Sequence, residues 1–204
     1  MPLYKTLKVN ENTKVLIWKI EESIETLNKG ITLTENCQNR VDGMKSELHK
    51  RGFMSIRHLL AEVGYVDADL YYDDLGKPHL ENGWNISISH ANEFAAIMLN
   101  KNGACGIDIE KISPKIARIK HKFLNDTDLK NITTEQNLTI YWGAKEALYK
   151  YYGKKKVFFI EHLFIQNFNK NHHYFDGLIK MPHFTKKIPM AWEKIEDYML
   201  VYTQ

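Results

Sequence analysis

Gly106-Ile107-Asp108-Ile109-Glu110 alternates apolar and acidic residues, a pattern typical of a β-strand with one polar face. Side chains two residues apart on a strand point the same way, so Asp108 and Glu110 are expected on one face. A second stretch, Trp142-Gly143-Ala144-Lys145-Glu146-Ala147-Leu148-Tyr149-Lys150, predicts a helix on which Glu146 and Lys150 lie one turn apart. If strand and helix pack together, three carboxylates and a lysine converge, which indicates a Mg²⁺ site beside a phosphate-binding cation.

Each stretch taken alone also has a structural explanation. Asp108 and Glu110 would suit the solvated face of an outer strand whose isoleucines, Ile107 and Ile109, point inward. Glu146 and Lys150 would suit an ordinary ion pair on a helix surface, which contributes little to stability. The metal-site hypothesis therefore depends on the two stretches meeting in the fold.

The rest of the chain mixes strands and helices, which predicts an α+β protein. A first strand is expected at Lys14–Ile20, a short helix at Ser23–Asn28, and a longer helix over 45–63, where apolar residues recur at helical spacing. The segment 72–78 has the glycine and proline of a turn, and Trp84–His90 alternates like a strand. The stretches 94–99 and 104–109 resemble a hairpin joined at Asn102-Gly103.

The second half of the sequence gives a helical, basic segment and then the helix of the acidic stretch. The first is expected from Ser113-Pro114 to Ile132, and the second over 138–151, with Thr133 and Gln136 as a capping box and Gly153 as its stop. The remainder, including 157–160, 162–167, 175–180 and 197–203, is expected to be mostly strand. Two halves, 1–103 and 104–204, would suit this layout.

The composition is that of a globular protein. The 204 residues, 44% of them hydrophobic and 26% charged, suffice for one full core or two small halves. No apolar run approaches the roughly 18 residues of a membrane span, and Met1–Lys8 lacks the layout of a secretory signal. Cys37 and Cys105 suggest no disulfide framework, so a reducing cytoplasm is the expected location.

Basic residues gather on both sides of the acidic segments although the net charge is only +3. They form two groups: Lys111, Lys115, Arg118, Lys120, His121 and Lys122, and then Lys150, Lys154, Lys155 and Lys156. Polyphosphate, an acidic protein or nucleic acid would each suit such patches, and so would plain solvation. No nucleic-acid motif accompanies them, so nucleic acid is not expected as a partner.

Other short motifs carry little information by themselves. Ser89-His90 follows an alternating strand without an acidic residue to complete a triad, and Gly76-Lys77-Pro78 is a turn. His172-His173 and His183 lack the spacing of a zinc site.

The order of these motifs is more specific than any one of them. A Gly-Lys-Pro turn, a Ser-His strand end, a Gly-Ile-Asp-Ile-Glu strand and a Trp-x-x-Lys-Glu-x-x-x-Lys helix follow one another between Arg57 and Lys156. This succession resembles the 4′-phosphopantetheinyl transferase superfamily. The resemblance implies transfer of the phosphopantetheine arm of coenzyme A to a serine of an apo acyl or peptidyl carrier protein, with release of adenosine 3′,5′-bisphosphate.

The resemblance also implies roles for individual residues. Asp108, Glu110 and Glu146 correspond to the Mg²⁺ ligands of the family, and Glu146 is in addition the best-placed base for the carrier serine. Lys150, expected to act on the leaving pyrophosphate, is the second catalytic residue. The other positions that match family contacts to the coenzyme are Lys145, Ser89, His90, Gly76, Lys77, Pro78 and Arg57.

The chain length and Glu110 resemble the longer, surfactin-synthetase type of the family, which implies a monomer with two similar halves related by a pseudo-twofold axis. On that basis residues 1–103 would hold the adenosine and phosphate side of the coenzyme, and residues 104–204 the metal-binding strand and helix.

Gly143 departs from the family's usual Ser, Cys or Thr, and either Asp126 or Asp128 matches an acidic residue of the intervening helix. A non-catalytic relative that binds coenzyme A or a carrier protein is the alternative. Which carrier is served, whether Mn²⁺ replaces Mg²⁺, and what holds the pantetheine arm stay open.

Overall fold

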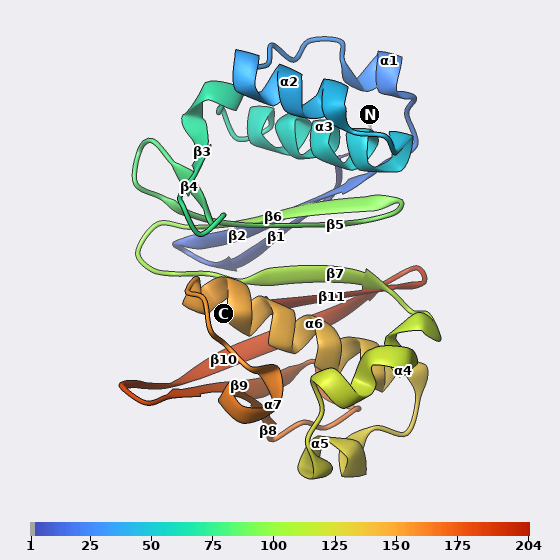
Figure 1. The fold of residues 1–204 in the computed structure, drawn as a ribbon, viewed down its shortest axis with the longest axis vertical. Coiled ribbons are helices and arrows are strands. Elements are labelled where there is room, and N and C mark those ends of the chain that lie inside the picture. Colours follow the sequence, from blue (N-terminus) through green and yellow to red (C-terminus); the bar gives the residue numbers. More distant parts are fainter. Residues whose placement is uncertain (1–2) are drawn as a thin grey trace. The chain divides into compact units, whose positions relative to one another are not determined.

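Two antiparallel sheets organise residues 3–204, which are the residues described by the computed structural model (Figure 1). The chain divides into two units, one ending at Gly103 and one running from Ala104 to Gln204. Each sheet belongs to one unit, and helices pack on both sheets. The expectation of a mixed helix-and-sheet protein is thereby confirmed.

Unit 1 is built on a six-stranded sheet in the order β1-β2-β6-β5-β4-β3. Its strands are β1 (Leu3–Asn10), β2 (Thr13–Lys19), β3 (Leu70–Tyr72), β4 (Pro78–Leu80), β5 (Asn85–Ala91) and β6 (Phe94–Asn100). Its helices are α1 (Ile24–Leu27), α2 (Glu35–Gly43) and α3 (Glu47–Ala61), followed by the 3-10 turn η1 (Asp67–Asp69). Helix α1 packs on α3, and α3 in turn packs on β2, β5 and β6.

Helix α3 confirms the helix expected over 45–63. The Ser46 hydroxyl accepts from the backbone N–H of His49 and so caps its first turn. Its apolar side chains, among them Ile56, Leu59 and Leu60, are buried in one core with residues of β2, β5 and β6. Burial of this face against the sheet fixes α3 in the unit, because the hydrophobic effect is the dominant favourable contribution to folding.

Unit 2 is built on a five-stranded sheet in the order β7-β11-β10-β9-β8. Its strands are β7 (Ile107–Lys111), β8 (Leu163–Gln166), β9 (Tyr174–Met181), β10 (Phe184–Ile195) and β11 (Tyr198–Thr203). Its helices are α4 (Lys115–Ile119), α5 (Asp126–Asn131), α6 (Glu135–Tyr152) and α7 (Phe159–His162), with the 3-10 turn η2 (Lys120–Lys122) after α4.

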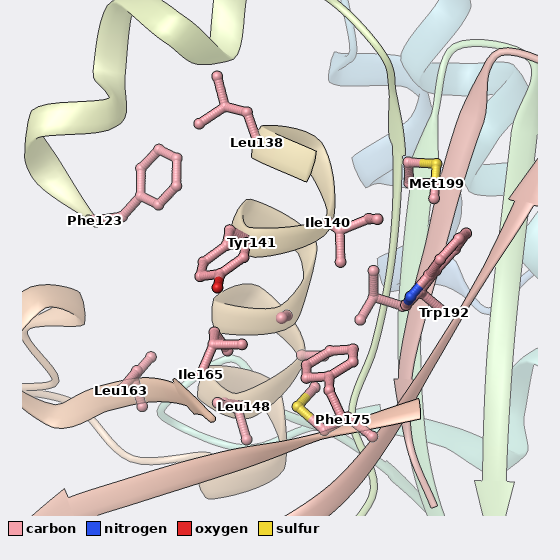
Figure 2. Close-up of a cluster of buried hydrophobic side chains, with 14 of the residues drawn as sticks. Phe123, Leu138, Ile140, Tyr141, Leu148, Leu163, Ile165, Phe175, Trp192 and Met199 are labelled. Atoms are coloured by element: carbon pink, nitrogen blue, oxygen red, sulfur yellow. The ribbon is translucent and has the colours of Figure 1, made fainter. Parts of the chain in front are cut away.

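Helix α6 is the central element of unit 2 and packs against β7 and β11. Its buried side chains Ile140, Tyr141 and Leu148 share a core with the sheet, and Phe123 from the preceding segment joins them (Figure 2). The helix ends as predicted at Gly153, which has a φ of 65° and donates its N–H to the Tyr149 carbonyl. The stretch that carries Glu146 and Lys150 is therefore held rigidly over the sheet.

The predicted hairpin between 94–99 and 104–109 is wrong. Strand β6 pairs with β2 and β5, so both of its edges are taken within unit 1. Strand β7 pairs with β11, the last strand of the chain, in the sheet of unit 2. Asn102-Gly103 lies at the boundary of the units, where the backbone N–H groups of both residues donate to the Asn100 side chain.

Several local predictions also need correction. Strand β1 precedes the strand expected to come first, and the 157–160 segment leads into the helix α7 and is not a strand. The basic helix expected up to Ile132 is broken into α4, η2 and α5. Helix α6 starts three residues early, and its cap is Thr134, which accepts from the Asn137 N–H, in place of Thr133. No helix in residues 3–204 has the length and apolar character needed to cross a membrane.

Candidate active site

Gly106 brings the start of β7 against α6. A Cβ built on Gly106 would lie only 1.9 Å from the Ala147 carbonyl oxygen and 3.0 Å from the Tyr151 backbone nitrogen. On its other side the Gly106 N–H donates to the Thr203 hydroxyl, and the Gly106 carbonyl accepts from the Thr203 N–H. Only a residue without a side chain fits between this helix and this strand.

Asp108 and Lys150 join the strand and the helix directly. Lys150 Nζ lies 2.7 Å from Asp108 Oδ1 and also donates to the Ile107 carbonyl oxygen at 3.0 Å. Asp108 is 3% exposed, which excludes a solvated outer strand face for this carboxylate. The lysine thus reaches across to β7, and its ion partner is Asp108, not Glu146 of its own helix.

Glu110 and Glu146 lie near the same pair. Glu110 Oε1 accepts a hydrogen bond from the Trp142 indole N–H at 3.2 Å, which ties the far end of β7 to α6. Trp142, Glu146 and Lys150 follow one another at four-residue spacing and so share one face of the helix. The strand and the helix therefore bring together the four residues that the sequence singles out, Asp108, Glu110, Glu146 and Lys150.

The excess of negative charge changes how these carboxyl groups titrate. Burial, and secondly repulsion from Asp108, raise the pKa of Glu110 to about 7, although Trp142 and Lys150 act in the opposite direction. Burial and Asp108 also raise the pKa of Glu146 to about 7, with Lys150 opposing and Glu110 adding to the shift. One lysine does not balance three carboxylates in this environment.

The donor chemistry of the three carboxylates suits Mg²⁺, which prefers carboxylate oxygens together with water and phosphate oxygens. A cation would also relieve the repulsion that raises the pKa values of Glu110 and Glu146. The side chains do not form a closed metal cage: across the described part of the chain, no group of three or more His, Cys, Asp and Glu side chains is arranged to hold a metal ion. Instead, Lys150 donates to one oxygen of Asp108, and the Trp142 indole donates to one oxygen of Glu110.

Gly143 is explained by its neighbour on β11. A Cβ at this position would lie 3.0 Å from Val201 Cγ2 and 3.5 Å from Asp108 Oδ2. The Ser, Cys or Thr suggested by the family resemblance would therefore crowd the branched side chain of Val201. Glycine at 143 accommodates valine at 201, and the helix stays close to Asp108.

Lys145 lies on another face of α6 and has different partners. Its Nζ is 2.6 Å from Asp128 Oδ2 and also donates to the carbonyl oxygens of Phe123 and Phe159. The side chain is fully buried, and burial lowers the pKa of Lys145 while Asp128 opposes that shift. Its contacts tie α6 to the segments around α5 and α7, and none is to a phosphate-binding candidate. The sequence left open whether Asp126 or Asp128 matches the family's acidic residue. Asp128 is the one that binds a side chain of α6.

The Gly76-Lys77-Pro78 element closes the turn between β3 and β4 in unit 1, and Pro78 is the first residue of β4. Asp73 organises it, because Asp73 Oδ1 accepts from the backbone N–H groups of Leu75 and Lys77, each at 2.9 Å. Asp73 Oδ2 lies 3.0 Å from His79 Nε2. These contacts lower the pKa of Asp73, with the His79 hydrogen bond as the largest cause. Lys77 is thereby presented on an ordered turn.

Ser89 and His90 end strand β5 in the same unit, with Ser89 buried and His90 exposed. Arg57 is only 2% exposed. Its Nε donates to Asp67 Oδ1 at 2.8 Å, and its guanidinium lies 3.5 Å from the centre of the Phe53 ring. Two further hydrogen bonds from Thr34 to Asp67 complete this buried cluster, so the contacts of Arg57 join α3 to η1.

Sequence reasoning missed the part played by Trp142 and Asp128. The Trp142 ring packs against the core of unit 2, and its indole N–H also donates to Glu110. Its spacing of four residues before Glu146 was the available signal, since such residues share a helix face. No local signal links Asp128 to Lys145, which lies 17 positions away.

Comparison with known proteins gives one family. The family model ACPS, described as the 4′-phosphopantetheinyl transferase superfamily, matches residues 104–195. A comparison with the curated proteins finds no match. The matched segment runs from the start of unit 2 to the end of β10 and contains Asp108, Glu110, Glu146 and Lys150. Residues 104–195, the part of the chain that builds the carboxylate and lysine site, are thus similar to the 4′-phosphopantetheinyl transferase superfamily.

Proposed function

We propose that this chain transfers the 4′-phosphopantetheine arm of coenzyme A to a serine of an apo carrier protein. The observation that carries the proposal is the Asp108–Lys150 ion pair, flanked by Glu110 and Glu146, within the segment that matches the transferase family. In the reaction the serine oxygen bonds to the β-phosphorus of coenzyme A. The bond from that phosphorus to the bridging oxygen breaks, and adenosine 3′,5′-bisphosphate leaves with the electron pair.

Asp108, Glu110 and Glu146 would hold Mg²⁺, which supplies charge stabilisation at the pyrophosphate when bound. Lys150 lies at the same place and would stabilise the negative charge of the leaving oxygen. Glu146 would take the proton of the serine, directly or through a water.

In unit 1, we assign contacts with the adenosine and phosphate groups of the coenzyme to Gly76, Lys77, Pro78, Ser89 and His90. The ordered turn at Lys77 and the exposed position of His90 support these assignments. Arg57 and Lys145 have weaker support, because both are buried in ion pairs. We also propose that the chain acts as a monomer whose units are related by a pseudo-twofold axis, as in the longer members of the family.

The proposal is tested by incubating the protein with coenzyme A, Mg²⁺ and a panel of fatty-acid, polyketide and peptide-synthetase carrier proteins in apo form. The mass of a served carrier should increase by one phosphopantetheine group. Glu146→Gln should abolish this increase because it removes both a metal ligand and the base. Glu135→Gln, at an exposed position of the same helix, is the matched control and should keep activity.

Two outcomes separate the alternatives. If the protein binds coenzyme A but no carrier in the panel gains mass, a non-catalytic relative is favoured over an enzyme. Full activity of Glu146→Gln would contradict the assignment of that residue while leaving the transferase proposal in place. Repeating the assay with Mn²⁺ identifies the preferred metal.

A further inference from the structure

Gly52 occupies an unfavourable place for a glycine. It is the sixth residue of the fifteen-residue helix α3 and is buried there. Glycine in a helix interior is less favourable than alanine by about 1 kcal/mol. Such departures from local preference are expected where a position serves a purpose other than stability.

The neighbour of Gly52 is the imidazole of His90. A Cβ built on Gly52 would lie 2.8 Å from His90 Nδ1, 3.1 Å from Cγ and 3.3 Å from Cε1. All three of the nearest atoms thus belong to one ring, which projects from the end of β5. The ring rests on the helix at the place where any other residue would carry a side chain.

This contact differs from the one at Gly106. There the nearest atoms are backbone atoms of α6, so that glycine allows two main chains to approach. At Gly52 the nearest atoms are those of a side chain that can rotate. Close packing of α3 on the sheet therefore does not require this glycine, whereas the position of the His90 ring does.

We infer that Gly52 is a positioning residue for coenzyme binding: its missing side chain lets the His90 imidazole lie on α3 in the orientation that contacts a coenzyme phosphate. The inference rests on the proposed function for the role of His90. Gly52 itself does not touch the coenzyme, and it acts only by positioning the His90 ring. A methyl group on Gly52 would meet side-chain atoms of His90, an exposed residue whose ring can change rotamer.

Gly52→Ala is a selective test of this inference. The added methyl group displaces a side chain and no backbone, and alanine favours the helix, so the variant should fold and melt at the wild-type temperature or above it. Gly43→Ala is the matched control, because Gly43 also lies in a helix, at the end of α2, and a Cβ there would meet nothing within 4 Å.

Coenzyme A affinity is measured by calorimetry for the wild type, Gly52→Ala, His90→Ala, the double variant and Gly43→Ala. Loss of a hydrogen bond to a charged phosphate should weaken binding about tenfold in Gly52→Ala and in His90→Ala. The double variant should bind no more weakly than His90→Ala, since Gly52 acts through that ring. The imidazole NMR signals of His90 should shift in Gly52→Ala and stay in place in Gly43→Ala.

The outcomes that overturn the inference are distinct from failure of the proposed function. Wild-type affinity in Gly52→Ala or in His90→Ala, unshifted His90 signals in Gly52→Ala, or a further loss in the double variant would each contradict the positioning role. A wild-type protein that does not bind coenzyme A would instead contradict the proposed function. In that case the His90 signals still report whether Gly52 places the ring.

Discussion

Lys150 has two tasks at the residue scale, because it neutralises a buried carboxylate and is proposed to act on the leaving phosphate. Its Nζ is 2.7 Å from Asp108 Oδ1, and the Asp108 side chain is only 5% exposed. Without the ammonium, Asp108 would lose this ion pair while its repulsion with Glu110 and Glu146 remained. We therefore expect the lysine to affect folding as well as the proposed chemistry.

For Lys150→Met we expect transfer to fall by about 100- to 1,000-fold, because charge on the leaving oxygen loses its stabilising cation. The free energy of unfolding should fall by about 1–3 kcal/mol, since a buried acceptor loses its partner. Urea unfolding and the carrier mass assay measure the two effects. Lys155→Met, at an exposed position beyond the helix end, should change neither. A Lys150→Met protein with wild-type turnover would contradict the catalytic role.

At the scale of elements, Lys145 and Asp128 join α5 to α6 through a buried ion pair. In Lys145→Met the carboxylate of Asp128 stays buried without its cation, so we expect a loss of about 3–5 kcal/mol in unfolding free energy. The double variant Lys145→Met/Asp128→Leu should recover most of that loss, because an apolar pair often replaces a buried ion pair at little cost. Urea unfolding of the single and double variants tests this.

The same double variant separates a structural role of Lys145 from phosphate binding. If it folds and binds coenzyme A with wild-type affinity, the ammonium of Lys145 does not contact the phosphates. If it folds but binds weakly, the phosphate contact implied by the family resemblance is retained. Calorimetry with coenzyme A distinguishes the two results.

The contact between β7 and α6 depends on Gly106. Gly106→Ala places a methyl group 1.9 Å from the Ala147 carbonyl oxygen and 3.0 Å from the Tyr151 nitrogen, and both of these are main-chain atoms. We expect the free energy of unfolding to fall by about 3 kcal/mol, at the upper end of usual overpacking effects. Gly103→Ala, where a Cβ would meet nothing within 4 Å, is the control for thermal unfolding. Equal melting temperatures of the two variants would refute the close-packing argument.

At the scale of the whole molecule, the raised pKa values of Glu110 and Glu146 make stability depend on pH. An unfolded glutamate loses its proton near 4.5, whereas these folded-state groups keep theirs up to about 7. Between these values the folded state binds more protons at these two groups, so their contribution to stability without metal is largest below pH 4.5 and is lost as pH rises to about 7. Burial raises the pKa of Asp67, but the Thr34 and Arg57 contacts together lower it below 3.8, so Asp67 acts in the opposite direction at lower pH.

Mg²⁺ should therefore stabilise the protein most above pH 7, where the carboxylates are ionised. Saturating Mg²⁺ at about 100 times its dissociation constant adds about 2.7 kcal/mol. Melting curves in chelator and in Mg²⁺, recorded from pH 5 to pH 8, should diverge as pH rises. Glu110→Gln/Glu146→Gln should remove both the pH dependence in this window and the response to Mg²⁺. Identical curves for the wild type with and without Mg²⁺ at pH 8 would contradict a metal site.

Much of the local structure that carries the candidate site is predictable from the sequence. The alternation of Gly106–Glu110 predicts a strand, and the spacing of Trp142, Glu146 and Lys150 predicts one helix face. The stop of α6 at Gly153 is also local, because that residue adopts a φ of 65°. These features depend on residues within a few positions of one another, so composition and periodicity suffice for them.

Only the tertiary structure decides which partners these elements meet. Lys145 and Lys150 lie on one helix, but five residues turn a helix by about 140° relative to its starting direction. Lys150 therefore faces β7, while Lys145 faces α5 and α7. Strand β7 pairs with the last strand of the chain in place of its neighbour β6, and the His90 ring rests on Gly52 from a strand far along the sequence. Periodicity determines the face on which a residue lies, whereas the packing of distant segments determines what that face contacts.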